Sequence, residues 1–130
     1  MAQAEVNVSF WLFGDFDPEA VSRRLGIAGS QHPARSGRWP RQASWTLSSG
    51  DDVQSDLFEP HMEWLLASIE PRAAALAALV SEGAEAHVNC DWSSSGSSGG
   101  PVISVESMSR LVSLKLPLVL SFHATGRAKE

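Results

Sequence analysis

Three polar residues that could perform acid–base chemistry alternate along one short stretch of the sequence, AEAHVNCDW. His87, Asn89 and Asp91 occupy every second position, and the residues between them are Ala86, Val88, Cys90 and Trp92. Successive side chains of a β-strand point to opposite faces, so this alternation predicts a strand with one polar and one apolar face. An imidazole beside a carboxylate could act as a base or as a pair of ligands. The alternative is a solvated or helix-covered sheet face whose polar groups are satisfied by hydrogen bonds.

The sequence lacks the spacings typical of metal and nucleophile sites. Its four histidines, His32, His61, His87 and His123, fall in four different predicted elements with no HxH or HExxH pattern. Cys90 is the single cysteine, which excludes an intramolecular disulfide, and its place on the apolar strand face predicts an inert core thiol. The SGSSGG stretch matches neither a nucleophile elbow nor a phosphate-binding loop. We therefore expect no catalytic residue, no metal and no cofactor.

A second candidate site is the stretch ARSGRWPR. It places Arg35, Arg38 and Arg41 around Trp39, within residues 28–41, whose many turn formers predict a loop or an irregular edge hairpin. Tryptophan and arginine are the residues most enriched in binding hot spots. We expect these four residues to contact a protein partner or another anionic group. The alternative is a tryptophan folded back onto the sheet edge, with the arginines in water.

The elements that must position these residues follow from apolar periodicity. Residues 6–13 alternate as a first strand that becomes buried on both faces toward its end. In GDFDPEAVSRRLGI, Asp17, Pro18 and Gly26 predict a short helix, and we interpret this stretch as a strand-to-helix joint and not as an anion site. The long helix of residues 58–69 carries a stripe of Phe58, Met62, Leu65 and Ile69.

The remaining elements complete a single domain over residues 1–130. They are a strand around Trp45 and Leu47, an alanine-rich helix between Pro71 and Gly83, the connector SSSGSSGG, a short strand at 101–105, a helix at 106–114 with Met108, Leu111 and Val112, and a strand at 118–122. The sequence thus predicts an α+β fold with a mostly antiparallel sheet of about five to six strands and three to four helices, ordered β-α-β-β-α-α-β-β-α-β.

Charge and hydropathy indicate the compartment. Ten basic and fifteen acidic residues give a net charge of −5, which argues against nucleic acid or an anionic membrane as the partner. The N-terminus lacks the pattern of an export signal, and the apolar stretches are interrupted short of the ~20 residues of a membrane span. We expect a cytoplasmic protein.

Several stretches resemble a family of small bacterial proteins, the DUF4279 domain of unknown function. They are FDPEAVSRRLGIA, SGRWPR, ASWTLSSG, LFEPHMEWLLASIEP and LPLVLSFHA, and together they extend over nearly the whole chain. The final SFHA departs from the more acidic and aromatic ending expected of the family. The resemblance implies the fold and the compartment, and it provides no catalytic residues.

Two functional hypotheses follow. The first is a non-catalytic interaction module of immunity or regulatory type, which binds a protein partner through a loop or a sheet face. The second is a small hydrolase or ligand-binding enzyme that uses His87, Asp91 or His61. A deep pocket with converging His and Asp groups would favour the enzyme, and an exposed aromatic patch without a cleft would favour the module.

The loop hypothesis predicts the behaviour of one variant. Trp39→Ala should change the free energy of unfolding by less than about 1 kcal/mol and should weaken partner capture by about 2 kcal/mol or more. Thermal unfolding and pull-down, measured on the same preparation, test both effects. A large fall in melting temperature would place Trp39 in the core.

Overall fold

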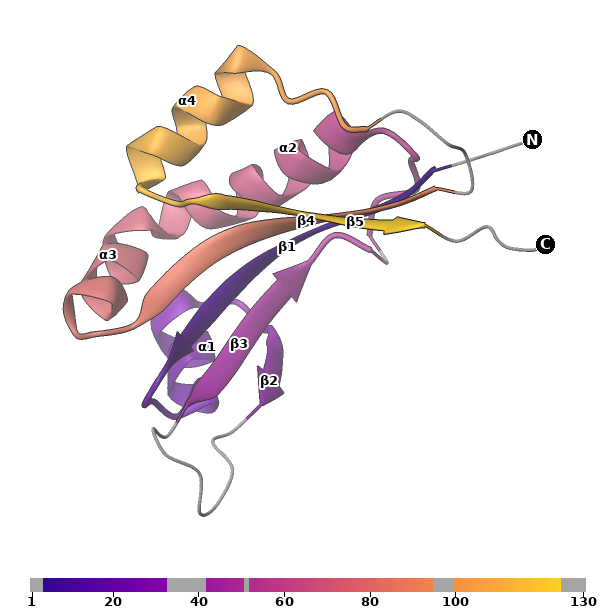
Figure 1. Cartoon of the computed structure of the whole chain (residues 1–130). Coiled ribbons are helices and arrows are strands. Elements are labelled where there is room, and N and C mark those ends of the chain that lie inside the picture. The colour runs from indigo at the N-terminus through magenta and orange to yellow at the C-terminus, as the bar shows by residue number, and fades with distance from the viewer. Residues whose placement is uncertain (1–3, 33–41, 51, 95–99, 125–130) are drawn as a thin grey trace.

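The fold is organised around one mixed sheet of five strands. The computed structural model describes residues 4–32, 42–50, 52–94 and 100–124, and in this part of the chain the strands lie in the order β2-β3-β1-β4-β5 (Figure 1). They are β1 Ala4–Gly14, β2 Ser30–His32, β3 Ala43–Ser48, β4 Glu85–Ser94 and β5 Leu118–Ala124. The β4–β5 pair is parallel and the other three pairs are antiparallel. The predicted α+β fold with a mostly antiparallel sheet is confirmed.

In the described part of the chain, four α-helices cover the same face of this sheet (Figure 1). They are α1 Pro18–Leu25, α2 Phe58–Ile69, α3 Ala73–Ser81 and α4 Val105–Leu114. Their buried side chains form one hydrophobic core with four even-numbered residues of β1, Val6, Val8, Phe10 and Leu12. On the opposite face, Trp11 and Phe13 are only half-buried. The expectation that β1 becomes buried on both faces is therefore wrong, because no described helix covers the second face.

The joint between β1 and α1 forms as predicted. Asp17 accepts a hydrogen bond from the backbone N–H of Glu19 at 3.1 Å, Pro18 is the first helical residue, and Gly26 ends the helix with φ +74°. Arg24 pairs with Glu82 at 2.7 Å. The stretch therefore acts as a structural joint, since helix capping explains its residues.

The α2 and α3 helices follow each other with one tight turn between them. Pro60 lies in the first turn of α2, where proline is tolerated, and Pro71 lies in a 3₁₀ turn, Glu70–Arg72, between the two helices. The run Phe58–Ser81 is long and apolar enough, by length and composition, to cross a membrane. Met62, Leu65 and Leu66 from this run are fully buried in the core with the sheet, as in the core helix of a folded domain.

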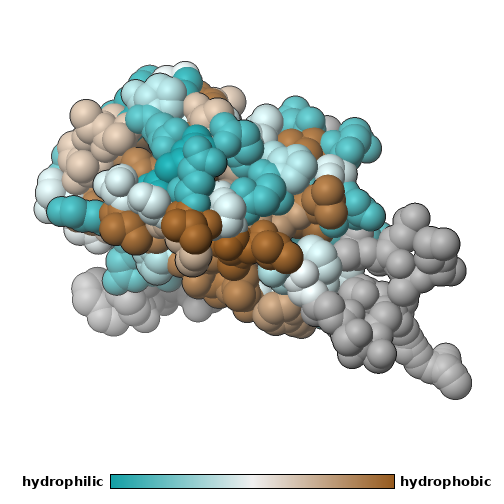
Figure 2. All heavy atoms as spheres, turned by 90° about the horizontal axis from the view of Figure 1, so that it is seen from above, coloured by the Kyte–Doolittle hydropathy of each residue, from teal (hydrophilic) through white to brown (hydrophobic). Residues whose placement is uncertain are grey.

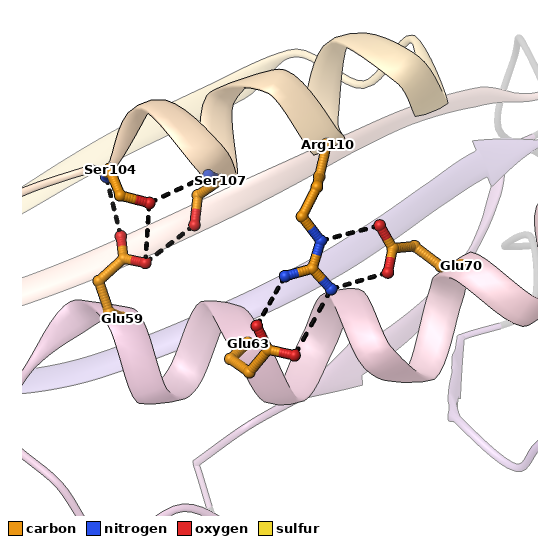
Figure 3. Close-up of polar contacts among 6 residues, drawn as sticks. All are labelled: Glu59, Glu63, Glu70, Ser104, Ser107 and Arg110. Atoms are coloured by element: carbon orange, nitrogen blue, oxygen red, sulfur yellow. Dashed lines mark hydrogen bonds and ion pairs between the residues drawn. The ribbon is translucent and has the colours of Figure 1, made fainter.

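The α4 helix is attached to α2 by polar contacts (Figure 3). The Glu59 carboxylate accepts hydrogen bonds from the N–H and hydroxyl of Ser104, at 3.0 and 3.1 Å, and from the Ser107 hydroxyl at 2.9 Å. Ser104 in turn caps α4 by accepting from the Ser107 N–H. Arg110 lies between Glu63 and Glu70, with contacts of 2.6 and 2.7 Å. These contacts fix how α4 is rotated about its axis.

Two predictions about this region are wrong. The strand expected at 101–105 does not form: residues 101–104 have no regular structure, because Ser104 caps the helix that begins at Val105. Of the expected stripe of Met108, Leu111 and Val112, only Leu111 is buried, because the polar contacts with α2 turn the other two outward. The central residues of the SSSGSSGG connector, 95–99, lie outside the described residues.

The buried stripe of α2 gives a stability prediction. Leu65 is fully buried, so Leu65→Ala should lower the free energy of unfolding by roughly 2–5 kcal/mol through lost burial and a residual cavity. Chemical denaturation measures the change. Leu57→Ala, at a leucine that is 63% exposed just before the same helix, is the matched control and should cost far less. Equal midpoints for the two variants would contradict the assigned core.

Candidate functional site

The sheet face opposite the helices collects aromatic and polar side chains from four strands. We call it the open sheet face. Strand register assigns to it Asn7, Ser9, Trp11 and Phe13 of β1, Ser44, Thr46 and Ser48 of β3, His87, Asn89 and Asp91 of β4, and Val119, Ser121 and His123 of β5. The site follows from strand periodicity, because the partners of these positions across each strand pair point to the same side.

An aromatic row lies along the central part of the open sheet face. The rings of Trp11 and Phe13 stack with centroids 5.5 Å apart and planes 6° apart, and the His87 ring stacks on Phe13 at 5.7 Å. The Trp11 indole N–H donates to Ser9 Oγ at 2.9 Å, and Ser9 is buried. Stacking and this hydrogen bond hold the rings in place while leaving them half-buried, as in a preorganised contact surface.

A chain of hydrogen bonds joins β4 to β5 on the same face. The Ser121 hydroxyl donates to Asn89 Oδ1 at 2.9 Å, and the Asn89 amide donates to Asp91 Oδ2 at 2.9 Å. His123 Nε2 lies 3.2 Å from the other carboxylate oxygen of Asp91. Asp91 and His123 form a carboxylate–imidazole pair of the kind that many hydrolases use. The hydroxyl beside them, that of Ser121, donates to Asn89 instead of to the imidazole. In this arrangement the Ser121 hydroxyl is therefore not activated as a nucleophile.

His61 belongs to a different environment, within the core. Its Nε2 lies 2.8 Å from the carbonyl oxygen of Ser55, which can only accept, so this nitrogen carries the proton. Nδ1 then accepts from Ser49 Oγ at 2.6 Å, and Ser49 Oγ accepts from the Val8 N–H at 3.0 Å. Ser49 and His61 are both buried. Every polar atom of this serine–histidine pair thus has a structural partner, and the pair ties α2 to β1.

The single cysteine is placed as expected. Cys90 is fully buried on the helix-covered face, and burial, with a smaller contribution from Asp91, raises the pKa of its thiol to about 11. The thiol is therefore protonated near neutral pH and is a poor nucleophile. Among the described residues, no three His, Cys, Asp or Glu side chains are grouped so as to hold a metal ion.

Three surface depressions lie away from His87 and Asp91. The largest, about 460 Å³, is lined by α3 and the end of α4; one of about 400 Å³ adjoins β2 and β3, and one of about 320 Å³ adjoins Arg24 and Glu82. A cavity of about 10 Å³ between Trp45 and Leu25 has room for about one water molecule. Neither His87 nor Asp91 lines any of these four spaces.

The structure brings together one of the two predicted sites. His87, Asn89 and Asp91 share the open sheet face as their alternation predicted. Arg35, Arg38, Trp39 and Arg41 lie outside the described residues, so the loop site stays a prediction. The sequence reasoning missed the contribution of Trp11 and Phe13, although both occupy the odd-numbered positions of the first strand. It also missed Ser121 and His123, whose role depends on the parallel pairing of β5 with β4, for which the sequence carries no local signal.

The fold and the site define a class: an α+β domain with one helix-covered sheet face and one open face. A family model extends this result, because the Domain of unknown function (DUF4279) matches residues 4–125. The chain therefore belongs to the DUF4279 family. No curated protein and no solved structure matches it.

The stacked position of His87 predicts a pH effect on stability. Burial lowers the pKa of His87 from its ordinary value of 6.5, so the folded state resists protonation of the ring. As the pH falls through 6.5, the unfolded chain binds a proton that the folded chain does not, and the free energy of unfolding decreases. His87→Phe keeps the stack and should flatten this decrease between about pH 7.5 and 5.5.

Denaturation midpoints across this range test the prediction. Hydrogen bonds from Arg110 and Arg24 lower the pKa values of Glu70 and Glu82 from their ordinary value of 4.5. The pH dependence of stability that these two glutamates contribute therefore lies below this range. His32→Phe, at an exposed histidine on β2, is the control and should leave the pH dependence unchanged. An identical pH dependence in wild type and His87→Phe would refute the assignment.

Proposed function

We propose that this DUF4279 protein is a cytoplasmic, non-catalytic binding module of immunity or regulatory type, which recognises a protein partner through the open sheet face. The observation that carries the proposal is the half-exposed row of Trp11, Phe13 and His87 on a face that no described helix covers. Stacked aromatic rings provide large contact area at little entropic cost, and aromatic residues dominate binding hot spots.

The polar chain beside the aromatic row supports the same proposal. Asp91 and His123 expose 37% and 54% of their side chains, so both can exchange hydrogen bonds with a partner. The face combines apolar contact area with neutral and acidic hydrogen-bonding groups, a mixture typical of protein–protein interfaces. The described residues assigned to this face include no Lys or Arg that could bind a nucleic acid, in agreement with the net charge of −5.

The geometry disfavours the enzyme hypothesis in the form that the sequence suggested. His87 and Asp91 are four residues apart along one strand, or roughly 14 Å at about 3.4 Å per residue, too far to share a proton. His61 is buried on the other side of the sheet. The pair formed by Asp91 and His123 is the remaining acid–base candidate, and it lies on the open face.

A matched pair of charge reversals tests the proposed function. Asp91→Arg reverses a charge on the open sheet face, whereas Glu106→Arg makes the same change on exposed α4. Wild-type protein and both variants serve as baits in extracts of the source cells, and bound proteins are quantified by mass spectrometry. We expect a partner that Glu106→Arg retains and that Asp91→Arg binds about 30-fold more weakly, which corresponds to about 2 kcal/mol.

Two outcomes would contradict this proposal. One is a set of captured proteins that is the same for all three baits. The other is turnover of chromogenic ester or phosphate substrates that His123→Ala abolishes, which would instead support the hydrolase. Circular dichroism on each variant establishes that the fold is retained.

A further inference from the structure

The two edges of the sheet are built differently. The β2 edge is only three residues long, and its side chains, Ser30, Gln31 and His32, are polar and exposed. The β5 edge is seven residues long, Leu118–Ala124, and its register with β4 runs without a bulge. Natural proteins protect long edge strands with lysine, proline, bulges or a covering segment. β5 contains no lysine and no proline, whereas β2 is protected by its shortness and polarity.

The helix beside this edge also presents apolar side chains to solvent. Val105, Met108 and Val112 recur at i, i+3 and i+7, so they form one stripe on α4. Ser107 and Arg110 face α2 (Figure 3), and Leu111 is buried in the core. The stripe is therefore turned away from α2. Val105 and Val112 are 77% and 75% exposed.

Strand and helix together form one apolar surface. Seven of the nine exposed large hydrophobic residues that the structure describes lie between residues 102 and 122. We call them the β5–α4 patch: Val102, Val105, Met108, Val112, Val119, Leu120 and Phe122. Figure 2 shows hydrophobic side chains gathered in a band along one side of the molecule, where β5 and α4 lie. A contiguous patch of this kind marks an interaction site.

The neighbouring parts of the chain are too polar to cover this patch. The two stretches outside the described residues that lie closest to it in the sequence are 95–99, SGSSG, and 125–130, TGRAKE. Between them they contain one alanine and no larger apolar side chain. These two stretches therefore offer little apolar surface to the patch, which favours another molecule as its occupant.

We propose that the β5–α4 patch is the interface with a second copy of this chain, formed by antiparallel pairing of the two β5 strands about a two-fold axis perpendicular to the sheet. In such a pair, residues directly opposite each other point to the same face. With the axis at Leu120 or Ser121, Leu120 lies opposite Leu120 of the partner subunit or Phe122 of the partner subunit. The apolar side chains on the helix-covered side then meet, and the two α4 stripes flank the seam.

Charge and area both favour a second copy. A two-fold interface brings a surface against itself, so charged side chains would repel their own copies. The β5 strand, which would lie at the seam, contains no Asp, Glu, Lys or Arg. Their combined exposed area is on the order of 600–700 Å² before backbone and polar atoms are added, close to the ~800 Å² per subunit of a standard stable interface. The main-chain groups at the outer edge of β5 would also gain hydrogen-bond partners.

Light scattering and sedimentation of the purified full chain test the proposal. The expected species is a dimer of twice 14.0 kDa, or 28 kDa. Val112→Lys and Phe122→Lys each place a charge in the seam and should give monomers. Val80→Lys is the matched control, since Val80 is an exposed valine on α3 outside the patch, and it should stay dimeric. Circular dichroism verifies that each variant is folded.

A cross-linking experiment tests the arrangement of the subunits. The native Cys90 is buried, so an introduced surface cysteine reports alone. Ser121→Cys on β5 should be linked to its own copy by a short bis-maleimide, whereas Ser30→Cys on β2 should not. A monomeric wild type would overturn the proposal. So would a dimer that both lysine variants preserve, or one that links through Ser30 only. Val112 and Phe122 lie outside the open sheet face, so the oligomeric state of their lysine variants can refute the dimer without refuting the proposed function.

Discussion

The placement of the four described helices on one face of the sheet is the constraint on which the other features depend. Side chains alternate along a strand, so one-sided cover divides each strand into core and surface positions. In β1, Phe10 and Leu12 enter the core while Trp11, between them, stays on the open face. The same division places Cys90 in the core and Asn89 and Asp91 on the open face of β4. The candidate site is thus a direct consequence of the way the core is closed.

Polar contacts decide how the helices are held against that core. Arg72 donates to the backbone carbonyl of Leu25 at 2.8 Å and so satisfies the C-terminal end of α1. The buried pair of Ser49 and His61 joins the turn after β3 to α2 and to β1. The contacts of α2 carboxylates with Ser107 and Arg110 fix α4. In α4 these contacts determine which apolar residues reach the core, and this is why Val112 faces solvent.

The sequence predicted best what is decided locally. Alternation identified the strands β1 and β4 and their core-facing residues, and the capping residues Asp17 and Gly26 identified the ends of α1, because strand period and helix capping act within a few residues. It failed where distant residues decide the outcome. The rotation of α4 depends on Glu59, more than 40 positions earlier in the chain. The pairing of Asp91 with His123 depends on the placement of β5 beside β4.

The open sheet face and the β5 edge can both be occupied at once, because one lies on a face of the sheet and the other at its edge. Pairing through β5 extends the sheet in its own plane, so the open faces of two subunits would lie on the same side of one ten-stranded sheet. Asp91 and His123, on the strands nearest the seam, would then lie near their copies, and the aromatic rows around Trp11 would lie farther out. A partner that spans the seam would meet two aromatic rows separated by a polar centre. Such a surface could hold two copies of a partner, or one symmetric partner, with an avidity that a single subunit lacks.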